Sequence, residues 1–380
     1  MATRSSTGPA IAWPQVHAFR LDRHRLTKPS ASTLPELCSA MGCFQAQVLS
    51  AAELQAGVRT AATTLEDVRR ALWNDRTLVK TSLMRGTLHV VSRDDYPIYI
   101  AALKASRLRQ MRQYRAKQGV SDKEQRRMTD EAIRALEDGP LSKAEITIAV
   151  ASRTRLSKAA KVWMNQSWDS VVRQAVVEGQ VCYAPDQGQE SVFVRTEQWL
   201  KKVREFDEDE AKQNLLRRFV RAFGPVTRRD FIKWTGFNVA EAASAWTALE
   251  DEFAKVSIDG DSYFICENDY DAVAMTPPKK QSLRLLPHFD PYLLAHHSKE
   301  HLVAPEHYKR VYRNAGWISP TVLRNGRVAG VWSHKRRGAC WNVDIEPFEN
   351  FSRSIQNSLR KEAKRMGEFL GLSADVTFAD

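Results

Sequence analysis

The sequence lacks the marks of a membrane or secreted protein. None of its apolar runs approaches the roughly 18 residues needed to cross a bilayer. The segment before residue 10 has no apolar core of a secretory signal. Its five cysteines are odd in number, scattered, and never spaced as Cys-x-x-Cys. That pattern is typical of reduced cytoplasmic thiols and argues against a structural zinc site, so we expect a cytoplasmic protein with no membrane association.

Signatures of metal and nucleotide chemistry are missing as well. The nine histidines form no His-Glu-x-x-His motif, and the 17 glycines form neither a Walker nor a dinucleotide-binding pattern. We therefore expect no cofactor and no metal ion. The chain is instead rich in positive charge, because 57 Lys and Arg oppose 45 Asp and Glu for a formal net charge of +12. Such an excess indicates an anionic partner, most simply nucleic acid, with a basic protein that binds no polyanion as the alternative.

Helix caps and hairpin turns divide most of the chain into a repeated pattern. A Ser, Thr or Asn followed three residues later by an acid predicts a helix start. These pairs are Ser50–Glu53, Thr64–Asp67, Ser142–Glu145, Thr227–Asp230 and Asn238–Glu241. Two strand-like segments follow each set of helices, around turns at Arg85-Gly86, at residues 185–188 and at Asp259-Gly260. Helices followed by a hairpin are the order of a winged helix, and the recurrence about every 80 residues predicts three such domains.

The chain beyond residue 280 is predicted to be richer in β-structure. Residues 281–287, 321–324, 327–332 and 339–345 have the pattern of strands, and residues 348–370 that of a final helix. The expected fold is therefore α+β and mainly helical. Its expected domains are winged helices over residues 10–120, 121–205 and 206–275, followed by a β-rich domain over residues 280–380.

Two groups of basic residues are candidates for contact with DNA. One group lies on the polar side of a helix predicted over residues 96–114, with no acid among its members, and the other lies at a predicted hairpin turn. Together they comprise Arg107, Arg109, Arg112, His334, Lys335, Arg336 and Arg337. A run of one sign is usually a solvated face, but it repels itself unless an anion neutralises it. Solvation and phosphate contact both remain open for these residues, and the hairpin is also suited to insertion into a DNA groove.

Gln45 and Gln47 form the most informative polar pair of the sequence. In extended backbone their side chains would point to the same side, with Ala46 facing away. Two neutral amides offer several hydrogen-bond donors and acceptors at one place and could hold a water molecule or a polar ligand. The alternative is a polar loop that arose by chance.

Taken in order, these motifs resemble the AlkZ/YcaQ superfamily of bacterial winged-helix DNA glycosylases. The resemblance is carried by Phe44–Gln47, by Met84–His89 and by Leu285–Leu294, and it spans roughly residues 12–370. It implies a C-shaped molecule of three tandem winged helices with a β-rich C-terminal part. It also implies action on alkylated purines, chiefly N7-alkylguanine. Some members unhook interstrand cross-links, and members of the AlkZ branch give self-resistance to DNA-alkylating natural products.

The resemblance also implies catalytic residues. The catalytic Gln-Φ-Gln element of the AlkZ branch falls on Gln45 and Gln47, with Ala46 smaller than the usual aliphatic residue. Further candidates for contact with DNA or with the lesion are Arg85, His288, Asp290 and Tyr292. For Arg85 a buried ion pair is the alternative, for Asp290 a turn-fixing role beside a proline, and for Tyr292 simple packing.

The chemistry is feasible without a carboxylate. N7 alkylation makes guanine a cationic leaving group, so a positioned water and electrostatic support suffice to break the glycosidic bond. Amides accept protons poorly, and undamaged purines should therefore be poor substrates. We expect a monofunctional DNA glycosylase that acts as a monomer on double-stranded DNA carrying alkylated bases. A non-catalytic winged-helix transcriptional regulator is the alternative.

Overall fold

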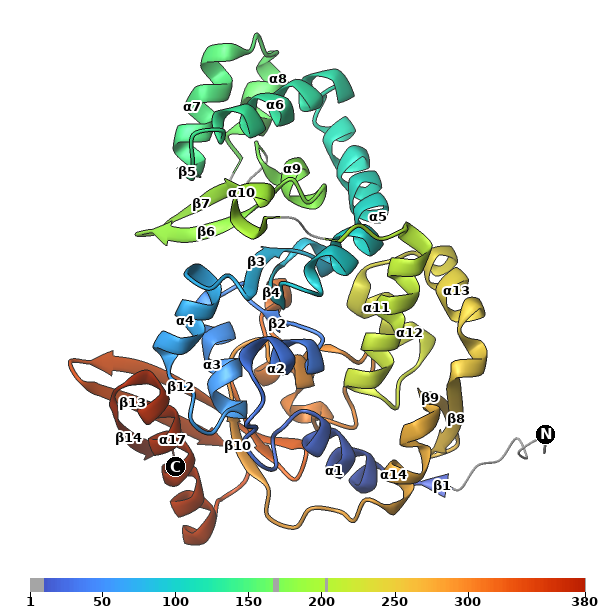
Figure 1. Cartoon of the computed structure of the whole chain (residues 1–380). Coiled ribbons are helices and arrows are strands. Elements are labelled where there is room, and N and C mark those ends of the chain that lie inside the picture. The colour runs from blue at the N-terminus through green and yellow to red at the C-terminus, as the bar shows by residue number, and fades with distance from the viewer. Residues whose placement is uncertain (1–9, 167–170, 202–203, 380) are drawn as a thin grey trace. The chain divides into compact units, whose positions relative to one another are not determined.

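The computed structural model describes residues 10–166, 171–201 and 204–379 (Figure 1). Its fold is mixed α+β, as expected. The chain forms two compact units. The discontinuous unit combines the segment up to Arg69 with the segment from Leu216 onward, and the continuous unit comprises Arg70–Leu215. The division into four domains stays a prediction.

The continuous unit is built from the long helix α5, several shorter helices, a hairpin and a three-stranded sheet. Its helices are α5 (Tyr96–Lys117), α6 (Asp122–Ala135), α7 (Lys143–Arg153), α8 (Lys158–Met164), α9 (Arg173–Val177) and α10 (Thr196–Leu200). Its strands are β3 (Leu78–Ser82), β4 (Leu88–Ser92), β5 (Leu141–Ser142), β6 (Val181–Gln187) and β7 (Glu190–Arg195), with a 3-10 turn η1 (Met84–Gly86) between the first two. β3 and β4 pair antiparallel, and a sheet of order β5-β7-β6 packs with α6–α9 around buried residues such as Met128, Trp163 and Phe193.

The discontinuous unit contains most of the remaining elements. Its helices are α1 (Trp13–Arg23), α2 (Leu34–Ala40), α3 (Leu49–Arg59), α12 (Arg228–Thr235), α13 (Val239–Ala248), α14 (Tyr270–Met275), α15 (Pro291–Leu294), α16 (Tyr308–Val311) and α17 (Arg353–Leu370). Its strands are β1 (Ala10–Ile11), β2 (Phe44–Gln45), β8 (Phe253–Ile258), β9 (Asp261–Cys266), β10 (Leu283–Leu286), β11 (Thr321–Arg324), β12 (Arg327–Arg337), β13 (Cys340–Pro347) and β14 (Ser373–Phe378). Short 3-10 turns are η2 (Glu250–Glu252), η3 (Glu267–Asp269), η4 (Pro305–His307) and η5 (Asn314–Gly316). The division points between the units fall within α4 (Leu65–Trp73) and α11 (Glu208–Phe223).

A five-stranded sheet supports the candidate site of the discontinuous unit. Its order is β10-β11-β12-β13-β14, antiparallel except for the parallel pair β13–β14. The two central residues of the β11–β12 turn, Asn325 and Gly326, both have positive φ, 52° and 87°. Such a turn matches the twist of the strands that it joins. α17 packs against β10, β14 and α3, which places α3 beside this sheet (Figure 1).

Most of the predicted helix starts are confirmed. Reciprocal capping bonds are present for Ser142–Glu145, Thr227–Asp230 and Asn238–Glu241, and also for Thr64–Asp67. The start predicted from Ser50 and Glu53 is wrong, because α3 begins at Leu49 without a side-chain cap. Glu53 is instead buried and accepts a hydrogen bond from Nε of Arg69 at 2.9 Å.

Other boundaries differ from the predictions. β12 continues through Arg337, so Lys335, Arg336 and Arg337 are strand residues and the turn follows them. The final helix begins at Arg353 instead of residue 348, and β14 was not predicted at all. The sequence also predicts a helix over residues 168–177, and residues 168–170 of it lie outside the described residues. No helix in the described part of the chain is long and apolar enough to span a membrane.

Candidate active site

The two glutamines lie at the start of the segment that leads into α3. β2 ends at Gln45, and the chain bends at Gln47 before the helix begins. Gln45 is 5% exposed and Ala46 is 1% exposed, whereas Gln47 is exposed. The pair therefore reaches from the interior of the discontinuous unit to its surface, and a molecule bound at Gln47 would remain in contact with solvent.

Gln55, in the second turn of α3, forms two hydrogen bonds with the backbone of Gln45. Its Oε1 accepts a hydrogen bond from the Gln45 N–H at 3.1 Å, and its Nε2 donates to the Gln45 carbonyl, also at 3.1 Å. The same Nε2 lies 3.1 Å from the carbonyl oxygen of His288. Because Gln55 is 0% exposed, these bonds form away from competing water. One buried amide thus joins the glutamine segment to the segment that contains His288.

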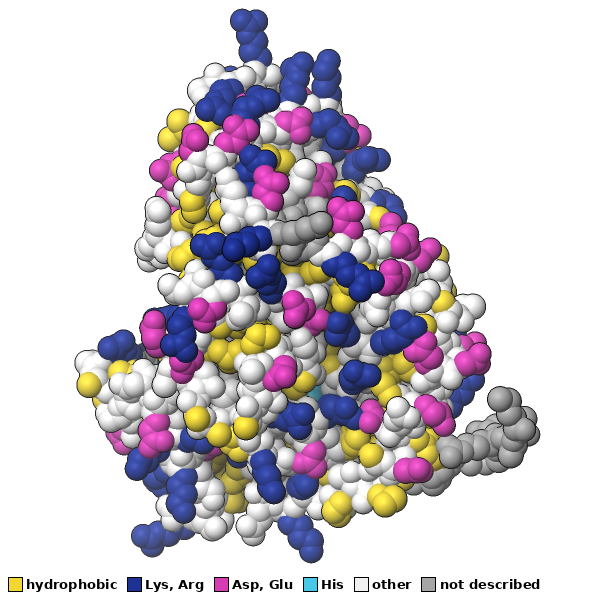
Figure 2. Space-filling view, in the orientation of Figure 1, with side chains coloured by type: hydrophobic (Ala, Val, Ile, Leu, Met, Phe, Trp, Pro, Cys, Tyr) yellow, Lys and Arg dark blue, Asp and Glu magenta, His cyan; other side chains and the backbone are white. Residues whose placement is uncertain are grey.

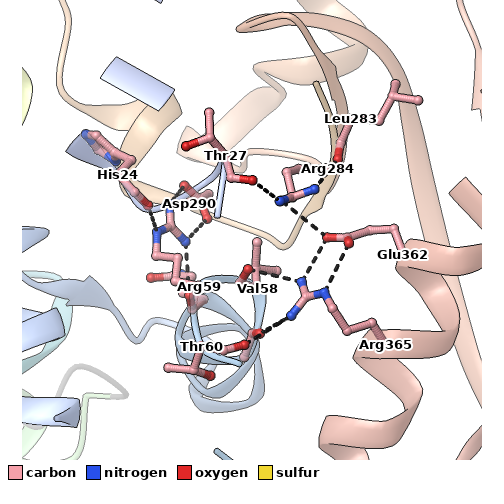
Figure 3. Close-up of polar contacts among 12 residues, drawn as sticks. His24, Thr27, Val58, Arg59, Thr60, Leu283, Arg284, Asp290, Glu362 and Arg365 are labelled. Carbon is pink, nitrogen blue, oxygen red and sulfur yellow. Dashed lines mark hydrogen bonds and ion pairs between the residues drawn. The ribbon is translucent and has the colours of Figure 1, made fainter. Parts of the chain in front are cut away.

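Arg59, one turn after Gln55 in α3, forms a buried ion pair with Asp290 (Figure 3). The two guanidinium nitrogens donate to the two carboxylate oxygens at 2.8 and 2.7 Å, and both side chains are 0% exposed. Arg59 also donates to the carbonyl oxygens of His24 and Gln55, each at 3.0 Å. A charge this deep is stable only when all of its polar atoms are paired, and this arginine meets that condition.

Asp290 and Tyr292 are buried parts of the framework. Asp290 caps α15 by accepting a hydrogen bond from the Tyr292 N–H at 3.0 Å. Tyr292 is 2% exposed, and its hydroxyl donates to the Gly326 carbonyl at 3.0 Å. Burial raises the pKa of this phenol. These contacts argue against direct contact of either residue with the lesion, and they support the turn-fixing alternative for Asp290 and the packing alternative for Tyr292.

A second arginine fixes the far end of α3. Arg365 of α17 donates to the carbonyl oxygens of Gly57 and Val58 at 2.9 and 3.0 Å (Figure 3). Its guanidinium is held in turn by Glu362, whose Oε1 lies 2.9 Å from one of the arginine nitrogens. The final carbonyls of a helix have no partner within the helix, so this contact supplies the missing donors. α3 is therefore anchored along its length and at its end.

His288 opens toward two hollows in the surface of the same unit. The first, of about 570 Å³, is lined by basic side chains that include Lys309 and Arg313, together with His334 of β12. The second, of about 350 Å³, shares His288 and Arg313 and adds Trp317, which is 44% exposed. The rings of His288 and Trp317 meet edge to face, with centroids 5.5 Å apart. An exposed indole beside the guanidinium of Arg313 is suited to bind an aromatic base and a nearby phosphate.

Comparison with known proteins identifies the family of this chain. Residues 38–369 match the family model described as DNA glycosylase AlkZ-like. The chain belongs to the AlkZ-like family. It is 31% identical over 376 residues to an interstrand DNA cross-link repair glycosylase of Streptomyces sahachiroi, covering 95% of this chain and 97% of the relative. The solved structure of the Streptomyces sahachiroi DNA glycosylase AlkZ superposes with a TM-score of 0.83 at 27% identity, covering 97% of this chain and all of that one.

Membership of the AlkZ-like family disfavours the alternative of a transcriptional regulator.

The remaining candidates of this AlkZ-like chain were predicted from positive charge alone. His334, Lys335, Arg336 and Arg337 are all exposed near the end of the β12–β13 hairpin. Although the side chain of His334 is accessible, partial desolvation by its neighbours lowers its pKa, with a smaller contribution from His288. Figure 2 shows basic side chains spread over the visible face with acidic ones between them, so charge alone outlines no path for DNA there.

The candidates on α5 lie in the continuous unit and are not alike. Arg109 is exposed, but Arg112 lies 3.5 Å from Oδ2 of Asp122, the first residue of α6. No acid lies within α5, as the sequence indicates, and the carboxylate beside Arg112 comes from the next helix. Arg107 turns toward Arg85 in the η1 turn.

Sequence reasoning missed Gln55, Arg59 and Trp317. Gln55 and Arg59 directly follow Leu54 and Val58, two apolar residues at helical spacing on the buried side of α3. A polar residue beside each of these apolar positions was the available signal. No local pattern marks Trp317, since its importance comes from the hollow that distant segments form around it.

Proposed function

We propose that this chain is a DNA glycosylase that hydrolyses the bond between a cationic N7-alkylated guanine and its deoxyribose. The observation that carries the proposal is the buried clamp by which Gln55 holds the backbone of Gln45. An enzyme that relies on positioning needs its water-binding groups held still, and this clamp supplies that constraint. Gln45 and Gln47 are the residues assigned to the water.

The state of the nearby carboxylates supports a reaction without a general base. Asp290 is fully committed to Arg59, and Glu53 is 4% exposed and bonded to Arg69. In the proposed reaction the water oxygen bonds to C1′ of the sugar as the C1′–N9 bond breaks. The electron pair of the broken bond neutralises the cationic base, and the water proton passes to solvent. The amides align the water and stabilise the developing oxocarbenium ion.

The two hollows beside His288 suggest how the substrate is accommodated. Their basic and aromatic lining fits a base that carries a bulky adduct. The relative from Streptomyces sahachiroi is named for interstrand cross-link repair. We extend the proposal to unhooking of such cross-links, in self-resistance to a DNA-alkylating natural product. Since the motif offers amides and no amine for covalent attack, the product is an intact abasic site.

The helix and hairpin segments are proposed to act as winged helices that hold the duplex. α12 and α13 followed by the β8–β9 hairpin have that order, as do α6 and α7 followed by the β6–β7 hairpin. Helix-turn-helix units are sized for a DNA groove, and this function accounts for the net charge of +12.

The test uses a duplex oligonucleotide with a single N7-methylguanine, followed by alkaline cleavage at abasic sites. The wild-type protein should produce strand breaks at the lesion and none in the undamaged duplex. Gln45→Ala and Gln47→Ala should each lower the single-turnover rate about 100-fold or more. Gln281→Ala, at an exposed glutamine of the same unit, serves as the matched control and should retain the full rate.

Two results would overturn parts of the proposal. If wild-type protein gives no breaks above the no-enzyme control, it does not have this activity. If the Gln45→Ala, Gln47→Ala double variant cleaves as fast as wild type, the activity stands but the assigned site is wrong.

A further inference from the structure

A tight turn presents the indole of Trp317 to solvent. The Trp317 N–H donates to the Asn314 carbonyl at 3.3 Å, and the two residues between them, Ala315 and Gly316, have φ of 55° and 76°. Glycine adopts such left-handed backbone freely, but an alanine there is strained. Strain of this kind persists only where the surrounding structure holds it, and it is common at ligand-binding sites. The turn leaves Trp317 44% exposed.

His288 fixes this turn to the candidate active site. Its Nδ1 lies 2.8 Å from the carbonyl oxygen of Ile318, the residue that follows Trp317. Because a carbonyl oxygen only accepts hydrogen bonds, this nitrogen carries the proton. The carbonyl of His288 accepts in turn from Gln55, whose amide also bonds the backbone of Gln45. A chain of buried and half-buried hydrogen bonds therefore joins the Trp317 turn to the glutamine segment.

The aromatic neighbours of Trp317 hold its indole without stacking on it. The ring centroids of Trp317 and His288 are 5.5 Å apart at an interplanar angle of 80°, and those of Trp317 and Phe289 are 5.2 Å apart at 45°. Within the described part of the chain no ring lies parallel to this indole. The hollow of about 350 Å³ lies beside it. A planar ligand can therefore enter the hollow and stack on the indole.

Arg313 supplies a positive charge to the same hollow. Its N–H donates to the Trp317 carbonyl at 2.8 Å, so the backbone at the base of the turn is fixed, and its side chain is exposed. The nearby Arg310 lies 3.4 Å from Glu346, whereas Arg313 forms no ion pair with any of the described residues. The Arg313 guanidinium is thus available to an anionic group of a ligand.

We propose that this hollow binds the damaged nucleotide itself, with its cationic base stacked on Trp317 and its phosphate on Arg313. The inference rests on the proposed function. An N7-alkylguanine nucleotide combines a positive base with a negative phosphate, and the hollow offers a partner for each. Indole attracts a cation more strongly than any other aromatic side chain, so neutral guanine binds less well. Trp317 is therefore a specificity-determining residue, and the base leaves the stack of the duplex to reach it.

The experiment compares the affinity of the full chain for two duplexes by fluorescence anisotropy. Both carry a 2′-fluorinated sugar at one position, which slows hydrolysis by destabilising the oxocarbenium ion, and the base there is either guanine or N7-methylguanine. Wild type should bind the N7-methylguanine duplex more tightly. Trp317→Leu should reduce that preference roughly tenfold, and Trp317→Phe, which keeps an aromatic ring, should retain part of it.

Tyr308→Leu is the matched control for these variants. Tyr308 is 45% exposed in the same unit and lines neither hollow, so its replacement should leave the preference unchanged. Equal affinity of wild type for the two duplexes, or an undiminished preference in Trp317→Leu, would overturn the proposal. If Trp317→Leu fails to fold, Trp317→Phe decides, because benzene attracts a cation less than indole does. A folded Trp317→Phe variant with the wild-type preference then overturns it.

The dependence of affinity on salt tests the phosphate contact separately. Arg313→Ala should lower the slope of log affinity against log salt by about 1 on both duplexes, without changing the preference for the cationic base. Arg313→Lys retains the charge and should keep the slope. An unchanged slope in Arg313→Ala would overturn the assignment of the phosphate.

The glycosylase assay on the unfluorinated lesion keeps this inference apart from the proposed function. Wild type without glycosylase activity but with a Trp317-dependent preference retains the binding site and rejects the enzyme. An active wild type whose preference survives in Trp317→Leu retains the enzyme and rejects the binding site.

Discussion

Gln55 is a buried amide of α3 between the apolar Leu54 and Ala56, and its hydrogen bonds all go to backbone atoms at the candidate site. Gln55→Leu keeps the approximate volume but leaves the Gln45 N–H and the Gln45 and His288 carbonyls without this partner. Each group left unsatisfied costs about 1–3 kcal/mol in the free energy of unfolding. Because Gln45 is then free to shift, the single-turnover rate should fall roughly tenfold to 100-fold, with the affinity for DNA unchanged.

Gln125→Leu is the matched control for this prediction. Gln125 is also a buried helical residue, but it lies in the continuous unit. Its side-chain amide accepts a hydrogen bond from Trp163 at 2.9 Å and donates one to Thr129 at 3.2 Å. The Gln125→Leu substitution should lower the free energy of unfolding and leave the single-turnover rate of the folded protein unchanged. Gln55→Leu protein that is fully folded and fully active would show that Gln55 is not a positioning residue.

The Arg59–Asp290 pair predicts an asymmetry between single and double substitutions. Asp290→Ala leaves a buried guanidinium without its counter-ion and should lower the free energy of unfolding by about 3–5 kcal/mol. Replacing both partners, as Arg59→Met with Asp290→Leu, should cost less because no charge is left unpaired. Chemical denaturation measures both.

An exposed pair provides the comparison. Arg310 and Glu346 lie 3.4 Å apart with both side chains exposed, so Glu346→Ala should change stability by less than about 1 kcal/mol. Equal costs for Asp290→Ala and Glu346→Ala would contradict the interpretation of the buried pair as part of the framework.

Single residues were predictable where their neighbours in sequence carry the signal. The Gln45–Gln47 spacing is local, and it was recognised together with the motif around His288. Gln55 and Arg59 act through partners 233 and 231 residues away, and no pattern within α3 indicates which carbonyl or carboxylate they meet. Asp290 was assigned to the turn or to the lesion with nothing in the sequence to decide, because its burial depends on that distant arginine.

At the scale of elements, the β11–β12 turn packs closely against two buried side chains, His17 and Tyr292. A Cβ on Gly326 would lie 2.5 Å from Cβ of His17 and 2.9 Å from the Tyr292 hydroxyl. Gly326→Ala therefore combines backbone strain of about 1–2 kcal/mol with overpacking of about 1–3 kcal/mol. Thermal unfolding should show a clear loss.

Gly260→Ala isolates the backbone contribution. Gly260 occupies the same position of the β8–β9 turn with nearly the same φ, 88° against 87°, and a Cβ there meets nothing within 4 Å. The Gly260→Ala substitution should therefore lower the free energy of unfolding by the backbone strain alone, without the contribution from overpacking. If the two variants unfold at the same temperature, the close approach at Gly326 has no energetic consequence.

Elements were predicted well where short-range chemistry determines them. The caps at Ser142, Thr227 and Asn238 and the turns at residues 259–260 and 325–326 each need only a few adjacent residues. The same rule failed at Ser50, because Glu53 bonds to Arg69 instead of capping the helix. β14 was missed since its parallel pairing with β13 depends on the intervening α17.

For the whole molecule, buried histidines predict loss of stability in acid. His17, His24, His89 and His296 are all at most 4% exposed. Burial is the largest cause that lowers each pKa, and Arg20 or other basic groups contribute as well; the resulting pKa is about 3 for His17 and His89 and about 4 for His296. In the unfolded chain they titrate near a pKa of about 6.5. Above that pH neither state binds the protons, and below it only the unfolded state does.

Stability should therefore be level above about pH 6.5 and fall below it, by about 1.4 kcal/mol per pH unit for each such histidine. The decline continues toward the native pKa values near 4 and 3. Urea unfolding at successive pH values measures it. His89→Gln should make the decline shallower by about one proton, and a stability that is constant from pH 7 to pH 5 would contradict the prediction.

The division of the chain into units could not be predicted from the sequence. Composition and spacing indicated consecutive domains, yet the segment up to Arg69 packs with the segment from Leu216 onward. The packing of these two distant segments depends on complementary buried surfaces, including the contacts of α3 with β10 and α17. No local sequence pattern encodes such contacts.

This discontinuity has a consequence for synthesis of the protein on the ribosome. The glutamine motif emerges early, but the groups that hold α3 in place, Asp290 and Arg365, are added only after the whole continuous unit has been made. The continuous unit can fold while the chain is growing, whereas the first segment must wait with its apolar surface uncovered. A nascent chain that ends before α17 therefore has both glutamines but lacks Arg365, and under the proposed function we expect activity only after translation has passed Arg365.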